Sequence, residues 1–552
     1  MRKDIIMNIA EYTSYINASL EKGTIGAYIS VGLFAFVGIC LLFGAYFGSR
    51  RGFSKSVIRL FIIGAAAVVS FLSVSWIAKL IVDNADKVSD GGTKTLDQII
   101  ESYFPEALAS MPNIAKDIIS EVQSTTATSL VLMILTIILC PVLVIAIFYL
   151  LKALTTPLYH LLSGLAGVIS FGKGIVSTLL GAAVGVIQGA VIAIVIIFPV
   201  SGLCGVAVDA RAPLLENTEN PNAYIEYGYT AIIDDLADNP LFETVNSLGG
   251  EALYEDLITV KIDGEKVNMG EKCIASAKVV ADMLPFIDEP FNYAHPSDSQ
   301  RTALNNMVAD IGGDEFVASL TADLLRGVAN AEINGKINLG MTEATKALLD
   351  DIMIMFTTST ADTVEGDLDV VIDVYFILCD RHLFESFDNG NHRDMRDLLT
   401  AKDENGVTNA DAILGRLKEY DRAAPIVTSF TKISLSVMHG NNDFHDKADE
   451  LYEAVKGDVA PALTHNKSDF ATEEEYREAV TTDIDQALAN NNITVSDEIK
   501  NNMVDYIADN YGDYEGEITD KEINDALLSY YQAYAATQNK TEGEGSTEGG
   551  AE

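Results

Sequence analysis

Charged residues are missing from four long stretches in the first part of the chain, at 25–48, 60–78, 122–151 and 174–208. A helix needs about 20 apolar residues to cross the hydrocarbon core of a bilayer. Buried helices of soluble proteins are usually shorter and show a single apolar stripe. A segment in hydrocarbon must be helical, because its backbone polar groups find no other partner there. We therefore expect four transmembrane helices, near residues 25–48, 56–82, 128–151 and 175–200.

Basic residues are scarce in the remainder of the chain. Residues 1–205 carry 13 basic and 11 acidic side chains, whereas the rest carries 24 basic and 68 acidic side chains. A region this acidic does not bind nucleic acid or an anionic membrane surface through its charge. It could attract cations or a basic peptide, although a solvated acidic surface explains the composition more simply.

Cysteines are few, and the common catalytic motifs are missing. Cys40, Cys140 and Cys204 lie in or beside the expected spans, where they pack as apolar residues. Cys273 and Cys379 either form one disulfide or, more simply, remain free thiols. The sequence has no His-Glu-x-x-His, no Gly-x-Ser-x-Gly and no zinc-ligand spacing. We expect neither enzymatic activity nor a cofactor.

Acidic residues are also missing from two short loops. The loop after the first span carries Arg50, Arg51 and Lys55, and the segment after the third carries Lys152 and Lys173. The loop between the second and third spans contains eight acidic residues between positions 83 and 121. Because basic short loops stay in the cytoplasm, both termini are expected on the extracytoplasmic side.

Glycines recur at four-residue spacing in the last span, at Gly181, Gly185 and Gly189, and in the first span at Gly44 and Gly48. Small residues on one helix face let a second helix approach closely. The pattern predicts a helix–helix interface, within one chain or between two. No acidic residue or arginine lies in the middle of a span to mark an ion path.

These motifs follow one another along the chain. Gly44 and Gly48 come first, then Arg51-Gly52-Phe53, then Gly172-Lys173-Gly174, the glycines of span four and finally Pro199. Over roughly residues 25–205 it resembles the colicin V production protein family of bacterial inner-membrane proteins. The resemblance implies four spans and a cytoplasmic turn formed by Arg51, Gly52 and Phe53. It also implies a role in toxin or peptide production or export and in envelope maintenance, with no established catalytic residues. The long acidic region is a departure from the typical short member.

The sequence thus predicts an all-α integral membrane protein, with four transmembrane helices followed by a mostly α-helical soluble domain. We expect an amphipathic segment at 1–24, the transmembrane domain at 25–208, an acidic extracytoplasmic domain at 209–536 and a disordered acidic tail at 537–552. Apolar periodicity predicts helices at 316–330, 343–356, 368–384 and 412–435, the last broken at Pro425. Asp263-Gly264, between 257–262 and 265–269, predicts one small β-hairpin.

Residues 511–522 follow the spacing of an EF-hand calcium loop, with Asp513, Glu515 and Glu522 as ligands. Tyr511 occupies the first position, where the loop needs an acid, so any calcium site would be weak. The alternative, which we favour, is a turn between two helices in which Thr519 and Glu522 form a capping box.

Three functions follow as hypotheses. The first is a non-enzymatic scaffold or export accessory in the bacterial plasma membrane, whose partners are the lipid bilayer, further copies of itself, another membrane protein or an extracytoplasmic protein or peptide. The second is a small oligomeric channel or transporter. The third is a membrane-anchored surface module that binds calcium weakly.

Overall fold

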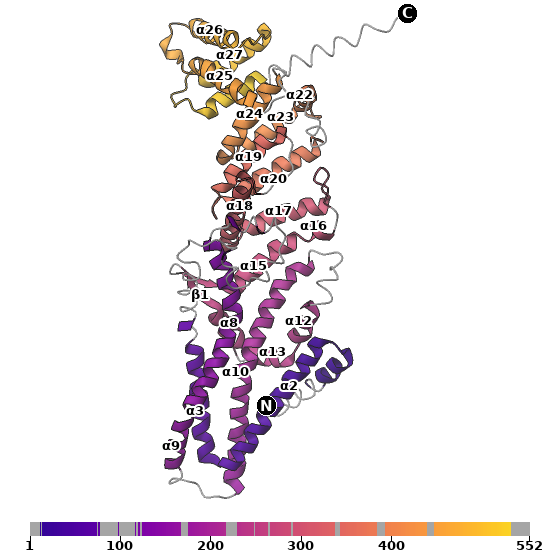
Figure 1. Ribbon diagram of the computed structural model, residues 1–552, viewed down its shortest axis with the longest axis vertical. Coiled ribbons are helices and arrows are strands. Elements are labelled where there is room, and N and C mark those ends of the chain that lie inside the picture. The colour runs from indigo at the N-terminus through magenta and orange to yellow at the C-terminus, as the bar shows by residue number, and fades with distance from the viewer. Residues whose placement is uncertain are drawn as a thin grey trace, which may run out of the picture. The chain divides into compact units, whose positions relative to one another are not determined.

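The computed structural model describes residues 12, 14–73, 76–77, 98, 116, 120–121, 124–166, 175–216, 229–247, 249–262, 265–288, 291–336, 343–383, 392–438 and 446–531. The chain is mostly helical (Figure 1). It divides into two compact units. The first comprises Met1–Met111, Val122–Pro290 and Thr302–Val317, and the second comprises Pro112–Glu121, Phe291–Arg301 and Ala318–Glu552. The expected tail at 537–552 lies outside the described residues.

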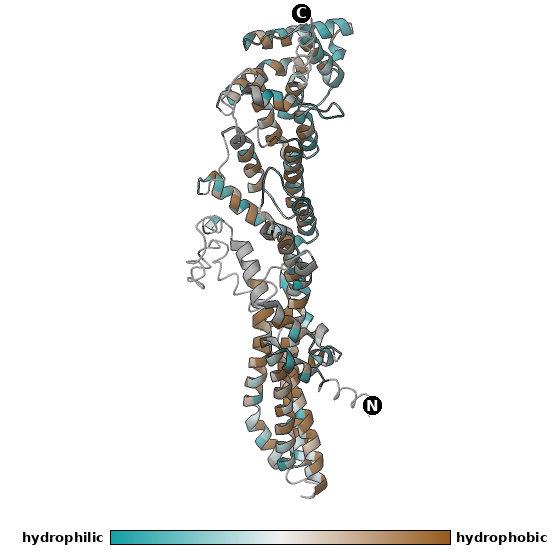
Figure 2. Cartoon of the chain, turned by 90° about the vertical axis from the view of Figure 1, so that its right-hand side faces the viewer, coloured by the Kyte–Doolittle hydropathy of each residue, from teal (hydrophilic) through white to brown (hydrophobic). Residues whose placement is uncertain are grey.

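Four helices of the first unit are long and apolar enough to cross a membrane. They are α2 (Ile25–Arg51), α3 (Phe53–Leu72), α8 (Ser124–Leu154) and α10 (Ile175–Glu216). Figure 2 shows that apolar residues cover these helices, whereas hydrophilic residues are more frequent in the second unit. The expected number of apolar helices is therefore confirmed. The last helix continues beyond the expected end near residue 200, because a proline such as Pro199 is tolerated inside an apolar helix.

The first unit also contains shorter helices, most of which pack against α2, α3, α8 or α10. They are α9 (Thr156–Ala166), α12 (Tyr229–Ala237), α13 (Pro240–Ser247), α14 (Gly250–Ile258), α15 (Met269–Asp282) and α16 (Pro285–Asp288). One apolar core joins Cys140 and Val144 of α8 and Phe198 of α10 to Phe242 of α13 and Tyr254 of α14. This compact unit consequently extends beyond residue 208, where the sequence placed the end of the transmembrane domain.

The small β-hairpin is present, with antiparallel strands β1 (Thr259–Ile262) and β2 (Glu265–Asn268). Ile262 pairs with Glu265, and the turn residues Asp263 and Gly264 lie outside the described residues. The expected first strand began too early, because residues 257 and 258 end α14 and point into the apolar core.

Helices α17 (Asp298–Gly312) and α18 (Glu315–Ile333) contribute residues to both units. In the second unit, α19 matches the helix expected at 343–356 closely, whereas α20 begins and ends four residues before the helix expected at 368–384. The helix expected at 412–435 is interrupted before Pro425. In order they are α19 (Glu343–Thr357), α20 (Val364–Asp380), α22 (His392–Thr400), α23 (Asn409–Lys418), the 3-10 turn η1 (Asp421–Ala423), α24 (Ala424–Met438), α25 (Asp446–Leu463), η2 (Lys467–Asp469), α26 (Glu473–Asn490) and α27 (Asp497–Tyr511), followed by helical residues 520–531.

A buried carboxylate holds the middle of the second unit together. The side chain of Asp367 in α20 is fully buried and accepts hydrogen bonds from Ser359 Oγ at 2.6 Å, Tyr420 OH at 2.7 Å and Arg422 Nε at 2.8 Å. Arg422 also donates to the carbonyl of Met355 at 3.1 Å. Because a buried charge is tolerated only when it is paired and hydrogen-bonded, this network fixes η1 against α19 and α20.

Candidate functional site

The glycines of α2 and α10 lie against each other within one chain. A Cβ atom added to Gly185 would lie 2.7 Å from the carbonyl carbon of Gly44, and one added to Gly48 would lie 2.8 Å from Cα of Gly185. A Cβ added to Gly189 would lie 2.8 Å from the carbonyl carbon of Cys40. Real Cβ atoms essentially never come this close to backbone atoms. The two helices therefore touch backbone to backbone, and we call this contact the glycine interface.

The turn between α2 and α3 closes one end of the glycine interface. Gly52 has φ of +76°, a left-handed conformation that side chains rarely adopt, and its N–H donates to the carbonyl of Gly48 at 3.1 Å. A Cβ on Gly181 would lie 2.9 Å from the carbonyl carbon of Gly52. Phe53 begins α3, and its N–H donates to Ser177 Oγ at 3.2 Å. The turn therefore favours glycine at position 52, and the close approach of the two segments requires glycine at position 181.

Polar groups beside the glycine interface are paired with each other. The amide of Gln188 is buried, and Nε2 donates to the carbonyl of Ser56 at 2.5 Å. Ser56 Oγ in turn donates to the carbonyl of Gly48 at 3.1 Å. The sequence indicates that Gln188 needs a partner in an apolar setting, but it does not identify Ser56 or Ser177, because neither serine belongs to a recognisable motif.

A second contact that the sequence does not reveal joins α8 to α14. Pro141 lies inside α8 and has no N–H, so the carbonyl of Ile137 lacks its usual helical partner. Tyr254 OH donates to this carbonyl at 3.3 Å. The Tyr254 ring lies over Gly202 of α10, where an added Cβ would be 2.6 Å from a ring carbon. Burial raises the pKa of the Tyr254 hydroxyl, which remains a hydrogen-bond donor at all physiological pH values.

The start of α2 is held by Asp235 of α12. Lys22 Nζ lies 2.9 Å from Oδ1 of this carboxylate, and the Thr24 hydroxyl donates to Oδ2. Ser30 Oγ and Tyr15 OH donate to the Asp235 backbone carbonyl at 2.7 and 2.6 Å. Burial on its own would raise the pKa of Asp235, but the hydrogen bonds from Thr24 and Lys22 outweigh it, and the pKa is lowered. The ionised carboxylate therefore stabilises this end of the first unit.

The loop at 511–522 forms the capping arrangement instead of a ligand cluster. Glu522 Oε2 accepts from the backbone N–H of Thr519 at 2.9 Å, and Thr519 Oγ1 accepts from the N–H of Lys521 at 3.3 Å. Asp513 is exposed with Lys467 as its charged neighbour at 3.9 Å, and Glu515 is exposed. Within the described residues, no three His, Cys, Asp or Glu side chains gather so that they could hold a metal ion. The cysteines are free, Cys273 and Cys379 included.

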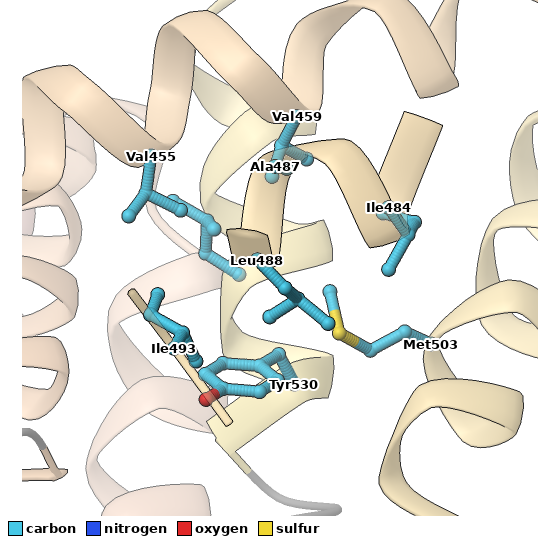
Figure 3. Close-up of a pocket in the computed structure, with 9 residues that line it drawn as sticks. Val455, Val459, Ile484, Ala487, Leu488, Ile493, Met503 and Tyr530 are labelled. Atoms are coloured by element: carbon cyan, nitrogen blue, oxygen red, sulfur yellow. The ribbon is translucent and has the colours of Figure 1, made fainter. Parts of the chain in front are cut away.

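Two cavities among the described residues of the second unit are small. One of about 10 Å³ lies between α25, α26, α27 and helical residues 520–531, and is lined by apolar side chains such as Val459, Ile484 and Met503 (Figure 3). Another of about 80 Å³ lies beside the ion pair between Lys418 and Asp525, whose atoms are 2.6 Å apart. Pockets for small organic ligands usually measure about 300 Å³ or more, so these two are packing gaps.

The glycine interface, its turn and the capped start of α2 join segments that lie far apart in the sequence. They are suited to holding helices at a fixed separation, and the glycine interface is the feature around which the first unit is built. No family model, no curated protein and no solved structure matches this chain.

Proposed function

We propose that this chain is a four-span, non-enzymatic membrane protein of the colicin V production type. It acts in a bacterial plasma membrane as a scaffold or accessory in toxin or peptide export and in envelope maintenance. The acidic helices of the second unit lie on the extracytoplasmic side and provide the surface for protein or peptide partners. Four apolar helices in one unit support the membrane location.

The observation that carries the proposal is the contact between the two motifs on which the family resemblance rests. The Arg51-Gly52-Phe53 turn and the glycines of α10 lie far apart in sequence, yet Gly52 packs on Gly181 and the Phe53 N–H bonds Ser177. Because they are in contact, the turn and the glycines of α10 form one structural unit.

The charge distribution supports the orientation. Arg50, Arg51 and Lys55 are at or beside the turn between α2 and α3, and no acidic residue occurs anywhere in 22–82 or 122–208. Short loops with an excess of Lys and Arg stay in the cytoplasm. The acidic second unit is then on the opposite side, away from the anionic surface of the cytoplasmic leaflet.

The channel hypothesis is less well supported. A channel assembled through the glycine faces needs those faces free, but Gly44 and Gly48 already contact Gly185 of the same chain. Copies of this chain would have to associate through other surfaces, such as the exposed apolar side chains Leu42, Phe61 and Leu72. These side chains are equally suited to contact lipid.

Reporter fusions test membrane location and orientation together. Alkaline phosphatase, which folds only outside the cytoplasm, should be active when fused after residue 540 and inactive when fused near residue 53. A fluorescent protein that matures only in the cytoplasm should give the reverse pattern at both sites. The opposite result at either site would overturn the orientation, and soluble fusions would overturn the membrane location.

Reconstitution separates the scaffold from the channel. The full chain in liposomes should show no solute-specific flux above that of empty vesicles, whereas cross-linking of the full chain in cells should capture extracytoplasmic or membrane partners. Selective flux that is lost on denaturation would favour the channel instead.

A further inference from the structure

Two histidine rings meet in the second unit, although they lie 87 residues apart in the sequence. The ring centres of His295 and His382 are 5.6 Å apart, and the ring planes are inclined by 55°. Both residues are exposed, so solvent and dissolved ions can reach the rings. We call these two residues the histidine pair.

The backbone at His382 is fixed by the end of α20. The Leu383 N–H donates to the Leu378 carbonyl at 2.9 Å, and the His382 N–H donates to the Cys379 carbonyl at 3.1 Å. These two bonds form a Schellman motif, in which the residue at the position of His382 is left-handed and is usually glycine. His382 has φ of +54°. A side chain held in this strained conformation is typical of positions that bind a ligand.

His295 is held in place by contacts with the same helix. The carbonyl of Tyr293 accepts a hydrogen bond from Tyr375 OH at 2.9 Å. On the other side of His295 in the sequence, Arg301 Nη2 lies 2.6 Å from Oδ1 of Asp380. The segment that carries His295 is therefore attached to α20 before and after the ring, and both imidazoles of the histidine pair have fixed supports.

The spacing of the two rings fits one transition-metal ion. Imidazole nitrogens ligate zinc at about 2.0–2.1 Å, so the centres of two rings around one tetrahedral ion lie roughly 5–6 Å apart. The observed 5.6 Å falls in this range. No third His, Cys, Asp or Glu of the described residues completes the set, so water would fill the remaining coordination positions. Catalytic zinc sites likewise keep an open position for water.

The charge of the surrounding region favours a cation but does not select one. Residues 206–552 carry 24 basic and 68 acidic side chains, and such an excess raises the local concentration of every cation. Imidazole supplies the selection, because it suits zinc, copper and nickel, whereas calcium and magnesium take oxygen ligands. A site formed by the histidine pair should therefore discriminate against calcium, and an acidic surface alone should not.

We propose that His295 and His382 bind one divalent transition-metal ion of the zinc type, through one ring nitrogen each, with water as the other ligands. The ion would link the segment at 291–301 to the end of α20. This site depends neither on the scaffold proposal nor on insertion in a membrane.

The test uses the full chain, purified in a neutral detergent without a histidine tag. Equilibrium dialysis should find one zinc ion per chain, and an excess of calcium should not displace it. Zinc should also raise the melting temperature, because an ion that binds only the folded state stabilises it. With copper in place of zinc, electron paramagnetic resonance should show two imidazole nitrogens at the metal.

Variants assign the binding to the histidine pair. Mutation of residues that merely orient a metal ligand typically costs about 10–100-fold in affinity, so loss of a ligand itself should cost at least about tenfold. We expect this loss in His295→Gln and in His382→Asn, and asparagine keeps a side chain that tolerates the left-handed backbone. His382→Gly relieves the strain, so it should melt higher than the wild type without zinc and still lose zinc binding.

His465→Gln is the matched control, because His465 lies in the same unit but pairs with Asp483 at 2.8 Å. It should leave zinc binding unchanged. Absence of zinc binding by the wild type would overturn the proposal. Equal zinc binding by the wild type, His295→Gln and His382→Asn, or equal displacement by calcium, would assign the ion to the acidic surface and would overturn it as well.

Discussion

Replacing Gly185 with alanine should weaken the packing of α10 against α2, although alanine is the better helix former. The added methyl group would lie 2.7 Å from the Gly44 carbonyl carbon and 3.0 Å from Cα of Gly48. Both neighbours are backbone atoms of a helix, so neither can rotate away as a side chain could. The two helices must separate instead.

The separation sets the size of the effect. Moving the methyl group from 2.7 Å to an ordinary distance from the Gly44 carbonyl carbon requires a shift of at least about 0.7 Å, because the Gly44 carbonyl oxygen lies closer still. A gap of roughly 0.5–1 Å forfeits a quarter to a half of the dispersion energy of the neighbouring contacts. Overpacking of this kind typically costs about 1–3 kcal/mol. Alanine also gains about 1 kcal/mol in helix propensity over glycine, which partly offsets the loss.

Gly205→Ala isolates the propensity term, because Gly205 lies in the same helix and has nothing within 4 Å of its added Cβ. Melting can be followed with a thiol-reactive dye, since Cys140 is fully buried and Cys40 packs beside Gly189. Relative to Gly205→Ala, Gly185→Ala should melt lower by on the order of 2–10 °C. If the two variants melted together, the close approach of α2 and α10 would be refuted.

Three further predictions concern other contacts. Asp367→Ala should lower the unfolding free energy of the second unit by about 3–5 kcal/mol in denaturant, because Arg422 loses its buried partner. Asp369→Ala breaks an exposed ion pair and should cost about 1 kcal/mol or less. Equal losses in the two variants would contradict the role of burial. Tyr254→Phe should cost about 1 kcal/mol by thermal melting, because it leaves the Ile137 carbonyl without a donor, and an unchanged melting temperature would count against that hydrogen bond. The pKa of Asp235 is lowered in the folded state, so the ionised carboxylate stabilises the protein above the ordinary pKa of 3.8, and this contribution is lost as the pH falls through the lowered pKa. Melting temperatures measured from about pH 3 to pH 6 should show that Asp235→Asn flattens the acid-induced loss of stability. Parallel curves of melting temperature against pH for the two proteins would disprove this role.

The parts of the fold that follow from local pattern could be predicted from the sequence. The absence of charge located four apolar helices, and Pro425 marked the interruption between α23 and α24, because both signals act over a few neighbouring residues. The hairpin was found, but its first strand was started two residues early because Leu257 and Ile258 are apolar in a helix as well as in a strand.

The partners of these elements could not be predicted in the same way. The spacing of Gly181, Gly185 and Gly189 identifies a face but does not say which helix covers it, and that pairing depends on contacts more than a hundred residues apart. Asp235 and Tyr254 lie in segments with no motif, and their importance comes from atoms that only folding brings near them. Proline at position 141 is the one local sign that a carbonyl in α8 needs an outside donor.

The hydrogen bond from Tyr254 to the Ile137 carbonyl has a consequence for how the protein is made. The donor is 117 residues downstream of the acceptor. At ordinary rates of protein synthesis, on the order of ten seconds pass between the two residues leaving the ribosome. During that interval α8 has been synthesised but the Ile137 carbonyl lacks this donor, so water or another chain must supply a substitute. Chains that end before residue 254 would therefore contain an α8 whose Ile137 carbonyl receives no hydrogen bond from Tyr254.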